Sequence, residues 1–325
     1  MSFLVPTEEQ LAISRGLAEF LADKFPVNRF RTSNVSEAER WGELVRMGIL
    51  GISLPETDGG MGLSLVDDVL VSREAGRNLV SPALIGNILA PHVAARAGSR
   101  KLCDSLLAGE RRVGIAMVHS QTEIRVIDGD SGIFLLVEPH RMRLMDCGSD
   151  GLRALACIDE TVQLSTAQVR ESELARVDGK DLVLAAELLA AAMLCGQLET
   201  TRDMAAEYAR TRVQFGRPIG AFQAIKHRCA DIALAAELCW SQTLHAADAL
   251  ASGAKDAEFH VRAAKLLAGD EALKAARFNI QAHGGMGFTA EVDAQLLMKR
   301  AHVLHQLFGD PRLVRSKLLD LTLVI

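Results

Sequence analysis

Hydrophobic residues recur with the period of an α-helix through almost the whole of residues 181–325. This pattern constrains the fold most, because a long helix must bury its apolar face along its whole length. The expected helices lie near 181–212, 222–252, 256–282, 290–307 and 310–323. Long helices in antiparallel succession are typical of an up-and-down four-helix bundle. We therefore predict a C-terminal helical bundle over 181–325.

The first part of the chain, residues 1–111, also carries helix signals. Thr7 with Gln10 and Ser36 with Glu39 fit capping boxes, in which side chains satisfy free backbone amides of the first helical turn. Further helices are expected near 64–76, 82–97 and 99–108. Aromatic residues make up only 4% of the chain and hydrophobic residues 49%, which favours helices over a β-sandwich and excludes disorder. These signals predict an N-terminal helical domain.

Residues 112–180 differ from both neighbours, because short apolar runs bounded by Asp, Gly and Ser replace the helical period. Runs at 113–118, 132–137 and 154–158 indicate β-strands joined by turns. The segment is short, so we predict a reduced β-domain that is stabilised by packing against its helical neighbours. The fold class that follows is mainly α, with a small β middle domain between a helical domain and a four-helix bundle.

Charge and cysteine content narrow the class of protein. With 36 basic and 41 acidic residues the net charge is −5, which argues against nucleic-acid binding. The six cysteines form no CxxC pair, so we predict reduced cysteines in a cytoplasmic protein. The most apolar run, 182–194, contains Glu187 and is too short to span a membrane. The N-terminus has no signal-peptide pattern, so neither secretion nor a membrane span is expected.

Three arginines cluster where the helix at 181–212 ends, in the segment Tyr208-Ala-Arg-Thr-Arg-Val-Gln-Phe-Gly-Arg-Pro-Ile219. Guanidinium groups pair with phosphate in a bidentate fashion, so the segment could grip an anionic ligand. The alternative is that arginines at a helix C-terminus only compensate the helix dipole. The segment alone leaves both interpretations open.

Three glycines within four residues separate two helices in Gln281-Ala-His-Gly-Gly-Met-Gly-Phe288. Glycine lets the backbone approach a ligand closely and exposes its N–H groups. The segment does not follow a strand, which excludes a Rossmann fingerprint. A tight turn between helices needs only one of these glycines, whereas a bound pyrophosphate or nucleotide explains more of them.

Together, YARTRVQFGRPIGAFQ at 208–223, QAHGGMGF at 281–288 and LLMKRA at 296–301 strongly resemble the C-terminal bundle of flavin-dependent acyl-CoA dehydrogenases. The resemblance covers roughly 181–308, and GISLPETDGGMGLS at 51–64 is similar to a loop of the family's first domain. It implies FAD at a dimer interface, an acyl-CoA substrate and electron transfer to an electron-transfer flavoprotein. In that family a Glu carboxylate removes the α-proton, and the flavin takes a hydride from the β-carbon.

The resemblance also implies cofactor contacts, all to the adenosine diphosphate half of FAD. They come from Arg212, Gln214, Phe215, Phe222 and Gln223, and, from across the dimer interface, from Gln281, Gly284 and Gly285.

The chain departs from the family at the catalytic base. At the commonest position of the Glu, counted from Gln281, it has Phe308, which cannot accept a proton. Some members place the Glu at the start of the first long C-terminal helix, where this chain has Ala186 followed by Glu187. A shift of one residue turns a side chain by about 100° around a helix, so Glu187 is a displaced candidate for the base. An ion-paired or surface Glu is the alternative.

The middle domain departs as well, because the TEPxxGSD and WITN-like stretches that hold the flavin ring and the thioester in the family are absent. A short chain without the usual Glu resembles the subunits of heteromeric family members. We therefore expect one subunit of a homo- or hetero-oligomer, dimer or tetramer, with the Glu on the partner. Steroid-degrading relatives are organised in this way, which favours a polycyclic acyl-CoA. The alternatives are a self-sufficient dehydrogenase that uses Glu187 and a structural or regulatory relative without catalysis.

The remaining polar residues predict no further site. His302 and His305 lie one helical turn apart, but no third metal ligand is evident, so no metal site is predicted. Asp67 and Asp68 are interpreted as helix caps or solvated side chains.

Overall fold

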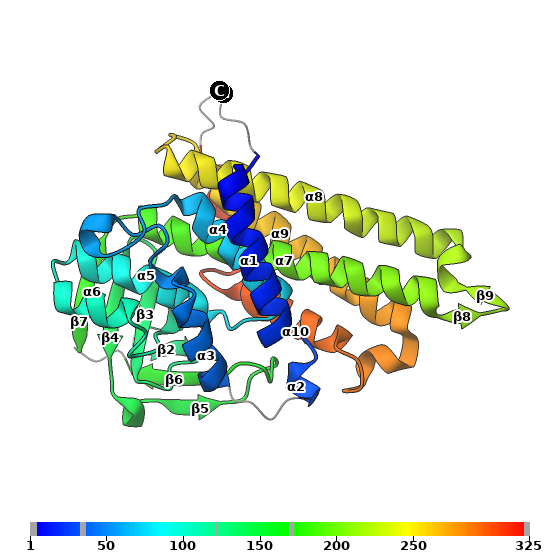
Figure 1. Cartoon of the computed structure of the whole chain (residues 1–325), viewed down its shortest axis with the longest axis horizontal. Helices are drawn as coiled ribbons and strands as arrows, with labels where there is room; N and C mark the ends of the chain where they lie inside the picture. Colours follow the sequence, from blue (N-terminus) through cyan, green and yellow to red (C-terminus); the bar gives the residue numbers. More distant parts are fainter. Residues whose placement is uncertain (1–4, 33–36, 121–122, 169–171, 322–325) are drawn as a thin grey trace.

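The computed structural model describes residues 5–32, 37–120, 123–168 and 172–321. Figure 1 shows a sheet covered by the N-terminal helices at one end, and long helices that extend away from it toward a small hairpin at the other end. The mainly helical fold with a small sheet in the middle confirms the predicted fold class.

Helices form the N-terminal part, as predicted. They are α1 (Glu8–Lys24), α2 (Arg29–Thr32), α3 (Glu37–Arg46), α4 (Leu65–Arg77), α5 (Ala83–Arg96) and α6 (Arg100–Leu107), with 3₁₀ turns at Ile49–Gly51 and Glu56–Asp58. The capping box at Thr7 is confirmed, because Gln10 N donates to Thr7 Oγ1 over 3.3 Å and Thr7 N donates to Gln10 Oε1 over 3.0 Å. The capping box expected at Ser36 lies outside the described residues.

The middle part is one mixed sheet with strand order β5-β6-β2-β1-β3-β4-β7. The strands are β1 (Gly114–Val118), β2 (Glu123–Ile127), β3 (Ile133–Glu138), β4 (Arg141–Asp146), β5 (Arg153–Leu155), β6 (Leu164–Gln168) and β7 (Glu173–Asp178). Strands β1 and β3 pair in parallel, and the other neighbours pair in antiparallel fashion. The runs at 113–118 and 132–137 are confirmed as strands, whereas the run at 154–158 overlaps only the short β5.

Four strands were not expected from the apolar runs. Strand β4, with the sequence RMRLMD, alternates charged and apolar side chains, and its residues are alternately half-buried and buried over its first four positions. Strand β2, with the sequence EIRVI, shows a similar alternation. Such strands are covered on one face only, so their signal is a period of two rather than a continuous apolar run.

The C-terminal part contains α7 (Asp181–Thr211), α8 (Gln223–Ala251), α9 (Ala257–His283), α10 (Ala294–Gln306) and α11 (Pro311–Asp320), which confirms the predicted helices. Helix α7 is long and apolar enough to cross a membrane by length and composition alone. Within the fold, 94% of its most apolar window is buried, as expected of the core helix of a bundle.

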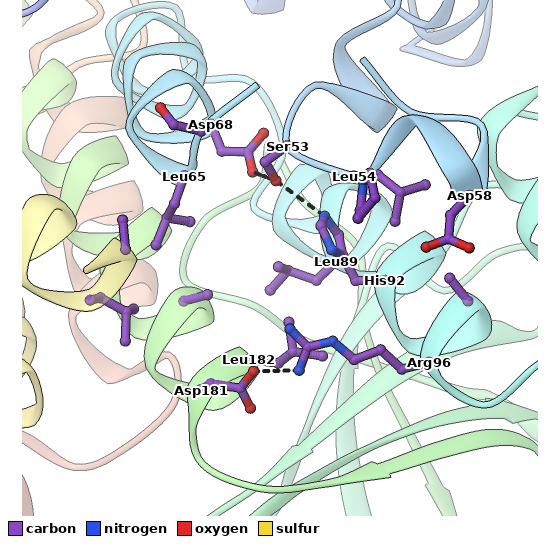
Figure 2. A pocket seen from close by; sticks show the side chains of 16 residues that line it. Ser53, Leu54, Asp58, Leu65, Asp68, Leu89, His92, Arg96, Asp181 and Leu182 are labelled. Atoms are coloured by element: carbon purple, nitrogen blue, oxygen red, sulfur yellow. Dashed lines mark hydrogen bonds and ion pairs between the residues drawn. The ribbon is translucent and has the colours of Figure 1, made fainter. Parts of the chain in front are cut away.

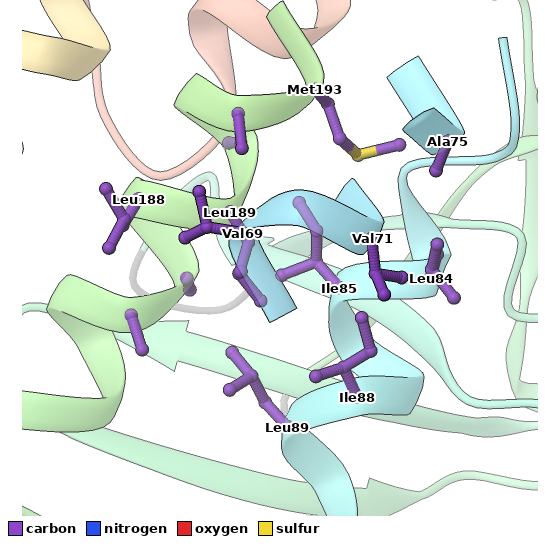
Figure 3. Packing of buried hydrophobic residues seen from close by; sticks show 14 of the residues in the cluster. Val69, Val71, Ala75, Leu84, Ile85, Ile88, Leu89, Leu188, Leu189 and Met193 are labelled. Atoms are coloured by element: carbon purple, nitrogen blue, oxygen red, sulfur yellow. The ribbon is translucent and has the colours of Figure 1, made fainter. Parts of the chain in front are cut away.

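Two glycines allow α4 and α7 to cross in close contact. A Cβ atom at Gly76 would collide with the carbonyl oxygen of Met193, and one at Gly196 would collide with that of Arg73. Figure 3 shows the apolar side chains that pack beside this crossing, among them Val69 and Leu189. Because each helix brings its glycine to the other's backbone, the N-terminal domain is held firmly against the bundle.

Arg300 of α10 joins all three parts of the molecule. Its Nε donates to Asp159 Oδ2 over 2.5 Å, and both side chains are almost fully buried. Its Nη1 donates to the carbonyl oxygens of Leu79 and Val80, over 3.1 and 2.7 Å. Its Nη2 donates to Thr161 Oγ1 over 2.6 Å. The sheet, the N-terminal domain and the bundle therefore share one buried cation.

Candidate functional site

The ends of α7 and α9 meet at the far end of the bundle. The ring of Tyr208 stacks on the imidazole of His283, with 3.9 Å between ring centres. His283 Nδ1 donates to the carbonyl oxygen of Asn279 over 2.8 Å, which fixes the orientation of the imidazole. This contact brings the arginine-containing segment and the glycine-rich segment side by side, although they are far apart in the sequence.

A small hairpin follows α7 and projects beyond the bundle (Figure 1). Strand β8 (Val213–Gln214) pairs with β9 (Arg217–Pro218), and the two residues of the turn, Phe215 and Gly216, have φ of 54° and 76°. Two positive φ angles are the mark of a type I′ turn, which suits glycine but strains a phenylalanine. The ring of Phe215 is held at the tip, where the residue is 93% exposed.

A pocket of about 460 Å³ lies between these two segments, and we call it the clamp pocket. It is lined by Tyr208, Arg212, Gln214, Ile219, Ala282, His283, Gly284, Gly285, Met286 and Thr289. Four of the eight predicted cofactor contacts are among them, namely Arg212, Gln214, Gly284 and Gly285. The two motifs, which the resemblance assigns to the two sides of a dimer interface around one FAD, also lie close together within the single chain. The reason is that α7 and α9 end at the same end of the bundle.

Arg212 is the one Arg or Lys among the described residues that line the clamp pocket, and it is well placed to bind an anion. Arg212 is exposed, and its guanidinium has no hydrogen bond or ion pair to any residue that the structure describes. Two residues earlier, Arg210 binds Glu207 over 2.6 Å and is turned to the surface. Arg212 is therefore the arginine available for a phosphate group, since no described carboxylate pairs with it.

The glycines of the second segment divide into two roles. A Cβ atom at Gly287 would collide with the carbonyl oxygen of Ile280, so this glycine is required by the turn itself. Gly284 has a φ of 63°, and a Cβ atom at Gly284 or Gly285 would meet no atom within 4 Å. Packing requires Gly287 and the backbone conformation requires Gly284, so Gly285 is the glycine that the described chain does not explain. The open space beside Gly284 and Gly285 is room for a ligand against bare backbone.

The other four predicted contacts lie around the clamp pocket but do not line it. Phe215 and Phe222 meet edge to face with ring centres 6.1 Å apart, and Arg217 lies over the Phe222 ring at 4.3 Å. Gln223 begins α8 and Gln281 lies near the end of α9, both with exposed side chains.

Glu187, the candidate base, lies inside the bundle rather than in a pocket. Its Oε2 is 3.8 Å from Arg262 Nε on α9 and has no hydrogen-bond partner among the described residues. Burial raises the pKa of Glu187, against the attraction of Arg262 and Lys265. Two residues earlier, Ala185 faces a cavity near the sheet end of the bundle. Because Glu187 is about 200° around the helix from Ala185, it faces the opposite direction.

Phe308, at the usual position of the Glu, packs between the bundle and the sheet. Its backbone N donates to Met117 Sδ over 3.1 Å, and its φ is 68°. The ring contacts the hydrophobic core. The position at which the resemblance predicts a carboxylate is therefore occupied by an apolar side chain.

Asp68 corrects the prediction for the acidic pair on α4. Asp67 completes a capping box with Ser64, as expected, since its Oδ2 accepts from Ser64 N over 3.0 Å. Asp68 is neither a cap nor solvated: the residue is fully buried and binds Ser53. Sequence analysis also missed Ser53 and His92, because only the fold brings residues so far apart in the chain together. The one local signal was that a second acidic residue, Asp68, directly follows Asp67 of the capping box.

Comparisons with known proteins agree with this architecture. The family model "Acyl-CoA dehydrogenase, N-terminal domain" matches residues 7–109, and "Acyl-CoA dehydrogenase, C-terminal domain" matches 185–316. The chain is 33% identical to "Acyl-CoA dehydrogenase IpdE2" of Mycobacterium tuberculosis, over 97% of this chain and 98% of that protein.

Two solved structures show the same fold at lower sequence identity. The ChsE4-ChsE5 complex from Mycobacterium tuberculosis matches with a TM-score of 0.82 and 23% identity, over 99% of this chain and 100% of that chain. A structure of PigA with FAD and proline matches with a TM-score of 0.83 and 20% identity, over 98% of each chain.

Proposed function

The chain belongs to the acyl-CoA dehydrogenase family, and from that premise we propose that it works as one subunit of a heteromeric member, with the catalytic Glu on the partner subunit. As a family member it is a flavoprotein oxidoreductase of the class that acts on CH–CH bonds, with FAD as cofactor. The proposal concerns the division of labour between this chain and its partner.

The observation that carries the proposal is the contrast between the clamp pocket and the position of the base. The clamp pocket has a guanidinium that no described residue binds, and open space against two glycines. These features fit the diphosphate and the adenosine of FAD, which need positive charge and close approach to backbone. At the base position, by contrast, Phe308 packs against the core.

Six residues of the clamp pocket have a defined task in this scheme. Arg212 would pair with one phosphate of the diphosphate, Gln214 would offer an amide, and the backbone around Gly284 and Gly285 would provide a surface without side chains. The stacked rings of Tyr208 and His283 hold the two segments together. When bound, FAD supplies the acceptor for the hydride that leaves the acyl β-carbon.

No side chain of this chain is assigned the removal of the α-proton. Glu187 is turned into the bundle toward Arg262, and Phe308 has no titratable group. We infer that the proton goes to a carboxylate of the partner subunit. A carboxylate base works best in a desolvated site where its pKa approaches the working pH.

The test is to purify the chain alone and together with the product of an adjacent dehydrogenase-like gene, and to measure FAD per chain and turnover of acyl-CoA substrates. We expect little flavin and no turnover from the chain alone, and both from the pair. Full activity of the isolated chain would contradict the proposal. Persistent absence of flavin in every pairing would instead favour a structural or regulatory relative.

The self-sufficient alternative, with Glu187 as base, has its own test. In the active preparation, Glu187→Gln should leave turnover within about twofold, because a residue that faces Arg262 inside the bundle does not reach the substrate. Loss of turnover by a factor of about 10² or more, with FAD still bound, would identify Glu187 as the base.

Three further assignments belong to the same proposal. The substrate is an acyl-CoA, and the family's heteromeric, steroid-degrading members favour a bulky polycyclic acyl group. Electrons leave through an electron-transfer flavoprotein. The protein works in the cytoplasm, which is supported by its six free cysteines, since that compartment keeps thiols reduced.

A further inference from the structure

A second cavity, of about 440 Å³, lies between the N-terminal helical domain and the start of the bundle. It shares no lining residue with the clamp pocket. Most of its wall is apolar and is made by Leu54, Leu65, Leu89, Leu182, Ala185 and Leu250. This volume is within the range of small-molecule sites, about 300–1,000 Å³.

One end of this cavity is polar. Figure 2 shows Ser53 between Asp68, which comes from α4, and His92, which comes from α5. Ser53 Oγ binds Asp68 Oδ2 and lies 3.1 Å from His92 Nε2. Across the cavity, Arg96 binds Asp181, and both side chains are about half exposed, so this ion pair forms the rim toward solvent.

The hydrogen bonds in the cluster have one consistent direction when Asp68 is ionised. A carboxylate only accepts, so Ser53 donates its single proton to Asp68 and accepts one from His92 Nε2. His92 Nδ1 is then an acceptor, and no hydrogen bond to it is found among the described residues. Asp68 Oδ1 is a second acceptor, buried and likewise without a partner in that part of the chain.

A buried carboxylate oxygen without a donor is costly, and few native side chains tolerate it. Burial raises the pKa of Asp68 to about 7 and lowers that of His92 to about 4. The nearest guanidinium that lines the cavity, Arg96, is engaged by Asp181 at the rim. Asp68 Oδ1 is fully enclosed by the chain, whereas His92 lines the cavity and is partly exposed, so His92 Nδ1 is the acceptor that a donor in the cavity can reach.

We propose that this cavity is a ligand site for a mainly apolar alcohol, whose hydroxyl group donates a hydrogen bond to the Asp68–Ser53–His92 cluster. The apolar wall takes up the hydrocarbon, and the acceptors at the polar end select a donor over a molecule that only accepts. The site does not depend on the heteromeric role, because the residues of the clamp pocket are not part of it.

The experiment compares 2-decalol with 2-decalone, which share a saturated bicyclic skeleton but differ in that only the alcohol donates. Calorimetric titration of the full-length chain should show the alcohol binding at least tenfold more tightly than the ketone. Asp68→Asn and Ser53→Ala should each remove most of this preference, and Ala185→Phe should weaken both ligands by filling the cavity. Asp203→Asn, at an exposed carboxylate on α7, is the matched control and should change nothing.

Equal affinity of the wild-type chain for alcohol and ketone would overturn the proposal, as would an absence of alcohol binding. A preference that survives both Asp68→Asn and Ser53→Ala would also overturn it. Circular dichroism checks that each variant is folded, and if Asp68→Asn is not, Ser53→Ala decides the outcome. Binding of the alcohol that Ala185→Phe leaves unchanged would place it outside this cavity and refute the site.

Discussion

From Leu182 to Glu199 every residue of α7 is buried, whereas from Arg202 to Thr211 only Ala205 and Ala209 are. We call these stretches the proximal and distal halves. The proximal half is enclosed by neighbouring helices and by the close crossing with α4, and the distal half extends to the clamp pocket and the exposed hairpin. The two halves of this continuous helix therefore differ: the proximal half is packed in the core and stabilises the fold, and the distal half is mostly exposed and ends at the clamp pocket.

The comparison predicts that substitutions in the packed region cost stability, whereas those at the distal end cost ligand binding. The largest effect is expected at the junction. Arg300→Met should lower the free energy of unfolding by about 3–5 kcal/mol, because it leaves the buried Asp159 carboxylate without its cation. Urea denaturation followed by circular dichroism measures this loss.

Lys299→Met is the matched control for that substitution. Lys299 pairs with Glu160 nearby, but both side chains are partly exposed, so its loss should cost no more than about 1 kcal/mol. Equal losses from the two variants would show that burial does not separate these ion pairs.

The packed region is interrupted by the cavity that Asp68 lines, and there we expect stability to depend on pH. The pKa of Asp68 is about 7 in the folded chain against 3.8 unfolded, so the folded state keeps a proton that the unfolded state releases. The contribution of Asp68 to stability should therefore decrease as pH rises from about 4 to 7, by a total of about 4 kcal/mol.

Asp68→Asn removes this titration, so its stability relative to the wild type should rise over the same pH range. Unfolding free energies of both proteins at several pH values test this prediction. His92 has a pKa of about 4, which makes stability rise from pH 4 to its unfolded value of 6.5, in the opposite direction. That contribution is common to both proteins and largely cancels in the difference. A difference independent of pH would show that Asp68 is ionised in the folded state.

A smaller loss is expected at the crossing of α4 and α7. Gly196→Ala places a methyl group against the carbonyl oxygen of Arg73, and overpacking of this kind costs about 1–3 kcal/mol. Gly16→Ala on α1 is the control, since nothing lies within 4 Å of its added methyl group. It should stabilise the helix by about 0.5–1 kcal/mol. Thermal unfolding gives the melting temperature of each variant relative to the wild type. Equal changes in the two variants would mean that the crossing is not tight.

The smallest effect on stability is expected at the distal end. Arg212→Ala should change the unfolding free energy by less than about 0.5 kcal/mol, because the guanidinium has no partner within the described chain. The flavin content of the co-purified complex should nevertheless fall at least tenfold. Arg210→Ala, which removes a surface pair with Glu207, should leave the flavin content unchanged. Retention of flavin by the Arg212 variant would contradict the proposal that the clamp pocket binds the diphosphate of FAD.

How much of the fold was predictable varies with the kind of signal. The helices of the bundle and the longer helices of the first domain were predicted to within a few residues, because an apolar face repeats over many turns. The one-turn helix α2 was not predicted. Strands β2, β4, β6 and β7 were missed because they are short. Strands β2 and β4 alternate in polarity, a signal that five or six residues carry weakly, and β6 (LSTAQ) and β7 (ELARVD) contain no long apolar run.

The candidate site shows the same division. The sequence motifs identified Arg212, Gln214 and the glycines, since these residue types are unusual at the end of a helix and between two helices. They did not show that both segments line one pocket of the same chain, nor that Glu187 faces Arg262 rather than a cavity. Rotation about a helix axis is set by packing against α9, and no local pattern near Glu187 records it.

By itself, the sequence determined the family and the helical character of both ends, and it predicted the residues that contact the cofactor and a Phe in place of the usual Glu. These properties are local, because they depend on residue type and on spacing within a helix or turn. Only the tertiary structure decided that Arg300 ties three parts together, that Gly76 and Gly196 meet, and that Ser53, Asp68 and His92 share one cavity. Such contacts join residues far apart in the chain, and they exist only once the helices have packed.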